Sequence, residues 1–457
     1  MAKVRKIFNT DLQINFNSKE ENFHLYWDSF LSSELGQIYQ VIPWKQLVRD
    51  FKLRGKIKGR RSIFDSQGKI ALQFLKHYTG LSDKRLMERI NADYQFQFFC
   101  GIDIRVDNPL TNFKIISEIR TELGKKLDIS LVQKTLAESW KPYIKDPRII
   151  MEDATCYESW LRYPTNVKLL WESNEWVYKQ IKQINKTIKG RMPRSKYSEQ
   201  KSKYLDYSRT RKKTRKKTQR RIRSLLYLLE KQLGQLSEIE QKLPENYYLP
   251  PRYYKRLEAA KKVLEQQKEL FEGRQVKDRI VSIDKSYIRP IVRGKETKRV
   301  EFGAKVNLLQ VDGINFIEHL SFDAFNEGTR LISSVWLAQT LFNTKVRMLG
   351  GDKIYGTNAN RKFCSQNGII TSFVRKGRAS KDEPVLKQIR KIINTERATR
   401  MEGAFGTQKN HYSLDKIKAR TKENETLWIF FGVHMANAVE ISRRKVQQVR
   451  EELGKTG

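Results

Sequence analysis

Apolar residues recur at helical spacing through much of the first 145 residues, which predicts a mainly helical segment. Within it, residues 69–78 form one such stretch, and Thr79-Gly80 ends it. Ser82 is placed to cap a second helix over residues 83–90. A helix, a glycine turn and a capped helix are compatible with a helix-turn-helix that reads DNA, and also with the plain packing of two helices.

The pattern changes to that of a strand at residues 148–151, and this apolar run leads directly into Asp153. A helical stretch follows over residues 167–183. Two further amphipathic stretches, 225–243 and 252–271, are separated by Pro244 and Pro250-Pro251, which predicts a coiled-coil-like helical hairpin.

Beyond residue 279 the spacing is typical of strands alternating with helices. Apolar runs at 280–283 and 299–311 predict strands, and Asp312-Gly313 predicts a tight hairpin to another strand at 314–322. The remaining predicted elements are a helix at 329–342, a strand at 345–349, a helix at 358–367, a strand at 369–374, a helix at 386–411 and a buried helix over the apolar run 427–439.

Without the helical hairpin, the order is a strand with Asp, antiparallel strands, a helix, a second strand with Asp, a helix, a strand and a helix with Glu. This order is that of the ribonuclease-H-like fold, so we expect an α/β protein with a mixed sheet and flanking helices. The predicted domains are an all-helical N-terminal DNA-binding domain (1–145), a first part of the catalytic core (146–184), a basic helical insertion (185–275) and a second part of the core (276–457).

The charge balance indicates a polyanionic partner. Lys and Arg number 90 against 51 Asp and Glu, a formal net charge of +39. Nucleic acid is the commonest such partner, and a membrane surface or a ribosome is the alternative. Residues 182–223 hold 18 Lys or Arg and two acidic residues, and such repelling like charges favour contact with a polyanion. The predicted DNA-binding residues of its densest run are Arg209, Arg211, Lys212, Lys213, Arg215, Lys216 and Lys217.

Cysteine and histidine patterns limit the metal chemistry. Cys100, Cys156 and Cys364 are far apart, without a CxxC pair, and the five histidines are scattered. A zinc finger or a disulfide framework is therefore not expected, and the odd cysteine count fits a reducing cytoplasm. Any bound metal would need carboxylate ligands, which points to Mg²⁺ or Mn²⁺. Neither a signal peptide nor an apolar run of bilayer length is visible.

Three carboxylates are candidates for such a site. Asp153 and Asp352 each follow an apolar run, and ligands gather at the carboxyl ends of strands in open α/β sheets. Glu402 shares a helix face with Lys409. Converging carboxylates would repel one another unless cations neutralised them, and two Mg²⁺ ions about 3.5–4 Å apart would do so while supporting an in-line attack on phosphorus. Lys409 and Arg397 are placed to hold the phosphate.

Four blocks of sequence carry a resemblance to a known family. They are Met151-Glu152-Asp153-Ala154-Thr155 with Tyr163-Pro164-Thr165, Val300-Glu301-Phe302-Gly303-Ala304-Lys305, Gly351-Asp352-Lys353-Ile354-Tyr355-Gly356 with Asn360-Arg361, and Arg400-Met401-Glu402-Gly403-Ala404-Phe405-Gly406 with Lys409. The chain resembles the DDE transposases of bacterial insertion sequences, in the group of the insertion-sequence-four and insertion-sequence-five types. The helical segment before residue 145 is also similar to the domain that precedes the catalytic core in this group.

The resemblance implies Asp153, Asp352 and Glu402 as catalytic and metal-binding residues, with two Mg²⁺ ions that Mn²⁺ can replace. Its partners would be double-stranded DNA, as transposon ends and target, and a second copy of the chain, without a membrane or a small-molecule substrate. The expected location is the cytoplasm, at the nucleoid. For the arginine of the glutamate block, Arg397 is one residue further from Glu402 than the family pattern asks, and Arg400 is its rival.

Other interpretations remain open at this point. Glu396 is a weaker alternative to Glu402 as the glutamate, because Phe-Gly and Lys do not follow it at the right spacing. A transposase-derived DNA-binding protein without catalysis and a ribonuclease-H-like nuclease are the alternative functions. An RNA-binding protein of the ribosome would explain the charge but not the three carboxylates.

Overall fold

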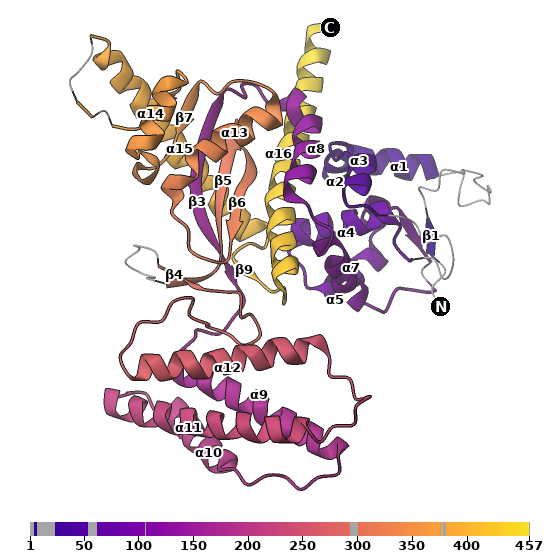
Figure 1. The fold of residues 1–457 in the computed structure, drawn as a ribbon. Helices are drawn as coiled ribbons and strands as arrows, with labels where there is room; N and C mark the ends of the chain where they lie inside the picture. Colours follow the sequence, from indigo (N-terminus) through magenta and orange to yellow (C-terminus); the bar gives the residue numbers. More distant parts are fainter. Residues whose placement is uncertain are drawn as a thin grey trace. The chain divides into compact units, whose positions relative to one another are not determined.

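The computed structural model describes residues 4–6, 23–53, 62–105, 107–292, 300–374, 376–377 and 381–456. Its chain divides into two units, and each is described by itself (Figure 1). The first unit holds Met1–Ser159, Lys305–Ser321 and Phe325–Gly457, and the second holds Trp160–Ala304 and Phe322–Ala324.

The first unit begins with a mainly helical region, but the expectation of an all-helical domain is wrong, because Val4–Lys6 and Ile102–Ile104 form an antiparallel strand pair. Its elements are β1 (Val4–Lys6), α1 (Phe23–Ser32), α2 (Glu34–Gln40), α3 (Trp44–Asp50), α4 (Ser66–Thr79), α5 (Asp83–Ala92), α6 (Tyr94–Phe99), β2 (Ile102–Ile104), α7 (Lys114–Gly124), α8 (Ile129–Trp140) and the 3-10 turn η1 (Lys141–Tyr143). The predicted turn between two helices is confirmed: Gly80 ends α4 in the left-handed conformation (φ 63°), and the Ser82 hydroxyl accepts the N–H of Arg85 at 3.2 Å.

Helix α4 packs against the long helix α16 (Lys422–Thr456), and α5 packs against α4, α6 and α7. Asp83, at the start of α5, forms ion pairs with Lys76 of α4 and Arg120 of α7, both at 2.9 Å. Both cations also lie near the ring of Trp428 on α16. Because α4 is buried over most of its length, any contact that this helix pair makes with a large partner must come from α5.

A mixed sheet forms the rest of the first unit. Its strands are β3 (Ile149–Ser159), β5 (Val300–Val311), β6 (Ile314–Ser321), β7 (Met348–Gly350), β8 (Ile370–Thr371) and β9 (Lys416–Ile417). They lie in the order β6-β5-β3-β7-β8, with β9 beside the end of β3. The β5–β6 pair is antiparallel, whereas β3–β7, β7–β8 and β3–β9 are parallel. The predicted mixed α/β architecture and the order of its elements are confirmed.

The predicted hairpin between β5 and β6 is also confirmed. Asp312 (φ 46°) and Gly313 (φ 83°) both have positive φ, as a two-residue turn between twisted strands requires. The Asp312 carboxylate accepts the Arg444 guanidinium of α16 at 2.9 Å. This contact attaches the tip of the hairpin to the helix behind it.

Helices cover both faces of the sheet (Figure 1). They are α13 (Leu331–Phe342), α14 (Asn358–Gln366), α15 (Glu383–His411) and α16, with the 3-10 turns η2 (Glu327–Thr329) and η3 (Lys353–Tyr355). Tyr157 and Ser159, two positions apart on β3, lie on one face of this strand: the Tyr157 hydroxyl bonds Gln408 of α15, and the Ser159 hydroxyl bonds Glu425 of α16 at 2.6 Å. Among the described helices, none combines the length and the apolar character that a membrane span needs.

The second unit is mainly helical. It contains α9 (Asn166–Thr187), α10 (Tyr197–Arg209), α11 (Arg215–Glu240), α12 (Pro251–Phe271), the short strand β4 (Pro290–Val292) and the first residues of β5. This unit is wider than the expected insertion at 185–275, because α9 packs lengthwise on α11 and shares its core. Tyr163 and Phe302 lie near the two ends of the unit, and their rings are in contact, with centroids 5.7 Å apart.

One predicted strand is wrong. Residues 280–283 form no strand, although they are apolar. Ile280 and Ile283 are instead buried in the core of the helical unit, together with residues of α9, α11 and α12. The apolar run therefore reflects packing of an irregular segment onto helices, a situation that a short run cannot distinguish from a buried strand.

Candidate active site

Asp153 lies in the middle of β3 rather than at the end of a short strand, which corrects the expectation from sequence. β3 continues to Ser159, where β9 pairs with it, and β5 is its neighbour on the side away from β7. The parallel partner β7, however, pairs only with Ile149 to Met151. Asp153 therefore follows directly after the end of the parallel pair, which is where ligands gather in sheets of this kind.

Asp352 is brought to the same level as Asp153. Met151 is paired with Gly350, so the register, continued by two residues, sets Asp352 opposite Asp153. Neighbouring strands are about 4.8 Å apart. The Asp352 carboxylate accepts the N–H of Lys353 at 2.6 Å and so caps the turn η3. The structure thus brings two of the three predicted carboxylates to neighbouring positions.

Gly350, two residues before Asp352, leaves no room for a side chain where α15 crosses the strand. A Cβ added at Gly350 would lie 2.4 Å from Met151 Sδ. It would also lie 3.0 Å from Ile393 Cγ2 and 3.4 Å from Arg397 Cβ, both on α15. Any side chain at position 350 would therefore push α15 away from the strand ends.

Helix α15 delivers cations to the aspartate strand. Arg397 Nη1 donates to Asp153 Oδ2 at 3.0 Å, and Lys409 Nζ donates to the Thr155 hydroxyl at 3.0 Å. Arg400 instead bonds Glu396 at 2.5 Å, one turn away on the exposed side of the helix. The geometry therefore favours Arg397 over Arg400 as the arginine of the site.

Glu402 lies on α15 between these two cations in sequence, but its side chain is exposed. In the described part of the chain, no group of three or more His, Cys, Asp and Glu side chains is close enough to hold a metal ion. The structure thus brings Asp153 and Asp352 together, and it does not place the carboxylate of Glu402 with them.

The electrostatics of the aspartate pair fit a divalent cation. Burial raises the pKa of Asp153 to about 6; the Ala154 N–H and Arg397 lower it, while the charges of Glu327 and Asp352 raise it further. The Asp153 side chain is still about one-fifth exposed. Two half-buried carboxylates whose charges repel one another, both oxygen donors, are the ligand set that Mg²⁺ prefers.

Two acidic residues near the site were not predicted. Glu152, on the other face of β3, is fully buried, and its pKa is raised to about 8, mainly by burial. Glu327 of η2 forms an almost buried ion pair with Lys305 of β5 at 2.7 Å. An acid next to Asp153 in a strand must face the opposite layer, so alternation alone would have revealed Glu152. Lys305 lies inside a block that resembled the family, but nothing in the sequence indicated its partner.

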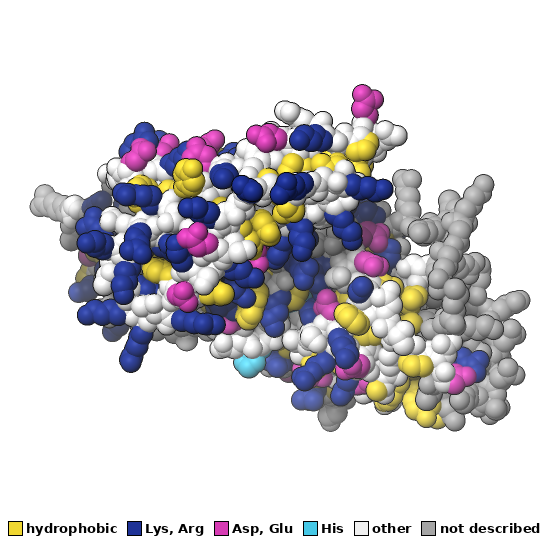
Figure 2. All heavy atoms as spheres, turned by 90° about the horizontal axis from the view of Figure 1, so that it is seen from below, with side chains coloured by type: hydrophobic (Ala, Val, Ile, Leu, Met, Phe, Trp, Pro, Cys, Tyr) yellow, Lys and Arg dark blue, Asp and Glu magenta, His cyan; other side chains and the backbone are white. Residues whose placement is uncertain are grey.

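The predicted DNA-binding run forms the connection between α10 and α11 and the first turn of α11. Its side chains are exposed, and its conformation is anchored: the Thr214 hydroxyl caps α11, the Tyr207 hydroxyl bonds that of Thr218 at 2.9 Å, and Lys213 lies over the Tyr207 ring. Lys and Arg side chains are spread widely over the helical unit in Figure 2, with few acidic ones among them.

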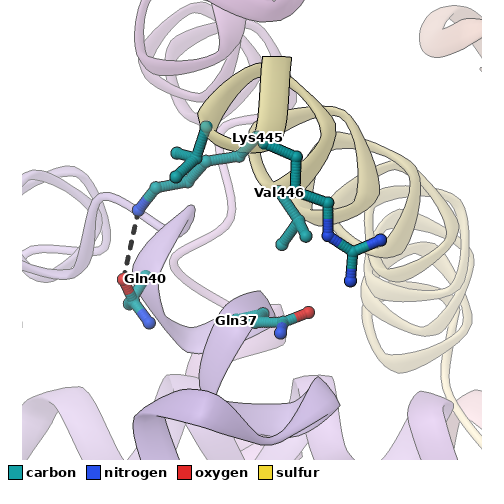
Figure 3. A pocket seen from close by; sticks show the side chains of 6 residues that line it. Gln37, Gln40, Lys445 and Val446 are labelled. Atoms are coloured by element: carbon teal, nitrogen blue, oxygen red, sulfur yellow. Dashed lines mark hydrogen bonds between the residues drawn. The ribbon is translucent and has the colours of Figure 1, made fainter. Parts of the chain in front are cut away.

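A shallow pocket lies elsewhere in the first unit, between α2 and α16 (Figure 3). Gln37, Gln40, Lys445 and Val446 are among the residues that line it, and Lys445 Nζ donates a hydrogen bond to Gln40 at 3.2 Å. None of the predicted site residues lines it. The chemistry is therefore to be sought at the open end of the β3–β7 pair rather than in a cavity.

Comparison with known families supports this assignment. Residues 26–122 match the family described as "Transposase domain (DUF772)", and residues 349–435 match "Transposase DDE domain". The second match includes Asp352, Arg397 and Glu402. No curated protein and no solved structure matches the chain significantly. The two matched domains, in this order along the chain, support a DDE transposase of an insertion sequence.

Proposed function

We propose that the chain binds the terminal inverted repeats of an insertion sequence and catalyses metal-dependent DNA cleavage and strand transfer. The observation that carries this proposal is the pairing of Met151 with Gly350, whose register sets Asp153 and Asp352 side by side beneath the Arg397 guanidinium. Two carboxylates and a cation at the open end of a strand pair suit phosphoryl transfer better than binding alone.

In this proposal Asp153, Asp352 and Glu402 are the metal-holding residues, within a ribonuclease-H-like core. Two Mg²⁺ ions, or Mn²⁺ in their place, would supply the activation of an attacking oxygen and the stabilisation of the leaving oxygen. Glu402 joins the pair by a change in its side-chain conformation, since its exposed position on α15 leaves it room to turn.

The cations of the site have separate roles. Arg397 compensates the charge of Asp153 before any DNA is bound, and it is then placed to hold the scissile phosphate. Lys409, held at Thr155, faces the same strand further along and binds a neighbouring phosphate. Arg400 pairs with Glu396 and contributes to DNA binding only through its charge.

DNA binding is assigned to two regions. The run Arg209–Lys217 contacts phosphates without regard to sequence, and the N-terminal helical domain (1–145) contributes base contacts, from α5 if its helix pair reads DNA. The chain acts as a homodimer on paired transposon ends and on target DNA, at the nucleoid of the cytoplasm. We propose that the core is divided by the helical unit Trp160–Ala304, which is wider than the insertion expected at 185–275.

The proposal is tested with Asp352→Asn and Asp153→Asn. In a cleavage assay on the element's end, we expect both variants to bind DNA like the wild type and to lose cleavage and strand transfer. Wild-type activity should require Mg²⁺ or Mn²⁺, and activity in excess chelator would contradict the metal site.

The same assay separates the alternatives. Unchanged DNA processing by Asp352→Asn would favour a role that does not use the carboxylates. Cleavage without strand joining on single, unpaired ends would favour a ribonuclease-H-like nuclease. Binding without any cleavage by the wild type would favour a DNA-binding protein that has lost catalysis.

A further inference from the structure

The outer side of α11 carries a continuous row of cations beyond the basic run already discussed. Between Arg215 and Lys231 there are seven Lys or Arg residues and one Glu. The row consists of Lys216, Arg220, Arg223, Tyr227 and Lys231, which are all exposed. Their spacings of four, three, four and four residues place them on one side of the helix.

The opposite side of α11 explains why this row faces outward. Leu225, Leu229 and Leu236 are fully buried in the core of the helical unit, against α9 and α12. The orientation of α11 is therefore fixed by its apolar side, and the basic side cannot turn inward. From Lys216 to Lys231 the row extends along about 22 Å of helix.

The charges of this row are not neutralised within the unit. Among the described residues, no ion pair is formed by Lys216, Arg220 or Lys231. The one acid in the stretch, Glu230, is bound by Lys268 of α12 at 2.6 Å. Arg223 lies over the Phe271 ring, 5.6 Å from its centroid, which holds its guanidinium in place without removing its charge.

An exposed aromatic ring lies within the row. Tyr227 is 72% exposed, and its neighbours on the same side are Arg223 and Lys231. A tyrosine between cations offers a hydroxyl donor to a phosphate and a flat surface to a sugar.

From these observations we infer that the α11 row Lys216-Arg220-Arg223-Tyr227-Lys231 is a docking track for one sugar-phosphate backbone of double-stranded DNA. The track continues from the run Arg209–Lys217 along the helix and ends before Glu238, where the side becomes acidic. This inference rests on the proposed function for its DNA partner, and it adds the residues and the direction of the contact.

The test neutralises three residues of the track, in Lys216→Gln/Arg220→Gln/Arg223→Gln. With a short random-sequence duplex and the full-length chain, we expect weaker binding at every salt concentration. We also expect the slope of log K against log salt to fall by about 2.7, at about 0.9 per lost phosphate contact. The matched control is Lys242→Gln/Lys255→Gln/Lys261→Gln, which removes the same charge from exposed positions of the same unit.

A slope unchanged by the track variant, or lowered equally by the control variant, overturns the inference. Cross-linking gives a second measurement that does not depend on affinity. A photoreactive phenylalanine analogue at Tyr227 should cross-link to bound duplex, whereas the same analogue at Tyr254 of α12, which is 55% exposed, should not. Equal cross-linking at both positions contradicts a track on α11.

The outcomes also separate this inference from the proposed function. A wild-type chain that fails to bind duplex DNA contradicts both. Normal binding and cleavage by the wild type, together with an unaffected track variant, contradict the track alone. Loss of RNA binding without loss of duplex binding in the track variant would assign the row to a different partner.

Discussion

Arg397 Nη1 lies 3.0 Å from Asp153 Oδ2, and this ion pair joins the long helix α15 to the central strand of the sheet. Both side chains are mostly buried, at 15% and 20% exposure. The pair stabilises the charged form of an aspartate that burial alone would leave protonated over a wider pH range. Arg397, although itself a cation, therefore keeps Asp153 in the charged form that a metal cation needs as a ligand.

Removal of this guanidinium should impair catalysis more than stability. We expect Arg397→Ala to reduce the cleavage rate by about 10²- to 10³-fold, the size typical of losing one charged group that stabilises a transition state. Arg400→Ala is the matched control on the same helix, and its rate should stay within a few-fold of wild type. Single-turnover cleavage measures both, and equal losses would contradict the separate roles of the two arginines.

The raised pKa of Asp153 predicts a pH dependence of metal binding. Below pH about 6 this carboxylate holds a proton that a divalent cation must displace, so the affinity for Mn²⁺ should rise with pH up to about 6 and then level off. Isothermal calorimetry between pH 5 and 8, with Asp153→Asn as the variant that has no proton to lose, tests this. A pH-independent affinity below pH 6 would sink the idea.

The same group affects stability in the metal-free protein. The folded pKa lies above the unfolded value of 3.8, so the folded state binds more protons between these pH values. Stability should therefore fall as pH rises from about 4 to 6, by an amount on the order of 3 kcal/mol at most. Urea unfolding with chelator present should show this loss in the wild type and not in Asp153→Asn.

The raised pKa of Glu152 predicts a second pH range, above that of Asp153, in which stability changes. Its pKa is raised from 4.5 to about 8, so the folded protein keeps this carboxyl protonated up to about pH 8 and loses stability as pH rises from 4.5 through 8. Glu152→Gln removes the ionisation and keeps the shape, and it should raise the free energy of unfolding at pH 8 more than at pH 5. An equal change at both pH values would show that Glu152 ionises freely.

Two glycines of the site region should respond in opposite ways to alanine. Gly350→Ala meets Met151 and Ile393 and should destabilise the protein by about 1–3 kcal/mol. Gly403 of α15 has open space where a Cβ would be, so Gly403→Ala should stabilise the helix by about 0.5–1 kcal/mol. Thermal unfolding compares the two, and a destabilising Gly403→Ala would mean that α15 is not helical there.

Much of the fold follows from periodicity because its elements are locally determined. The capped turn at Ser82 and the Asp312-Gly313 hairpin were predictable, since one or two residues dictate the backbone there. The irregular segment at Ile280 was not predictable, because its apolar side chains are buried against helices that are distant in the sequence. A short run of apolar residues indicates that a segment is buried, but it does not indicate which element buries it.

The candidate site was predictable in part for the same reason. The apolar runs before Asp153 and Asp352 could be recognised from local pattern, although β3 continues past Asp153, and the alignment of the two residues needed only the register of one strand pair. The choice between Arg397 and Arg400 could not be predicted, because it depends on the rotation of α15 about its axis. The contact between Gly350 and Ile393 sets this rotation. The Lys305–Glu327 pair likewise joins segments that no local pattern connects.

The ring contact between Tyr163 and Phe302 has a consequence for the order in which the protein assembles. The adjacent strands β3 and β5 are separated by the 140 residues between Ser159 and Val300, and closing so long a loop costs about 3 kcal/mol more than closing a turn of four residues. If the helical unit folds first, the contact between these two rings holds the two ends of the unit together. The 140-residue segment then acts as a short connection between β3 and β5. Early folding of the helices would then determine the rate at which the sheet forms and the aspartate pair is assembled.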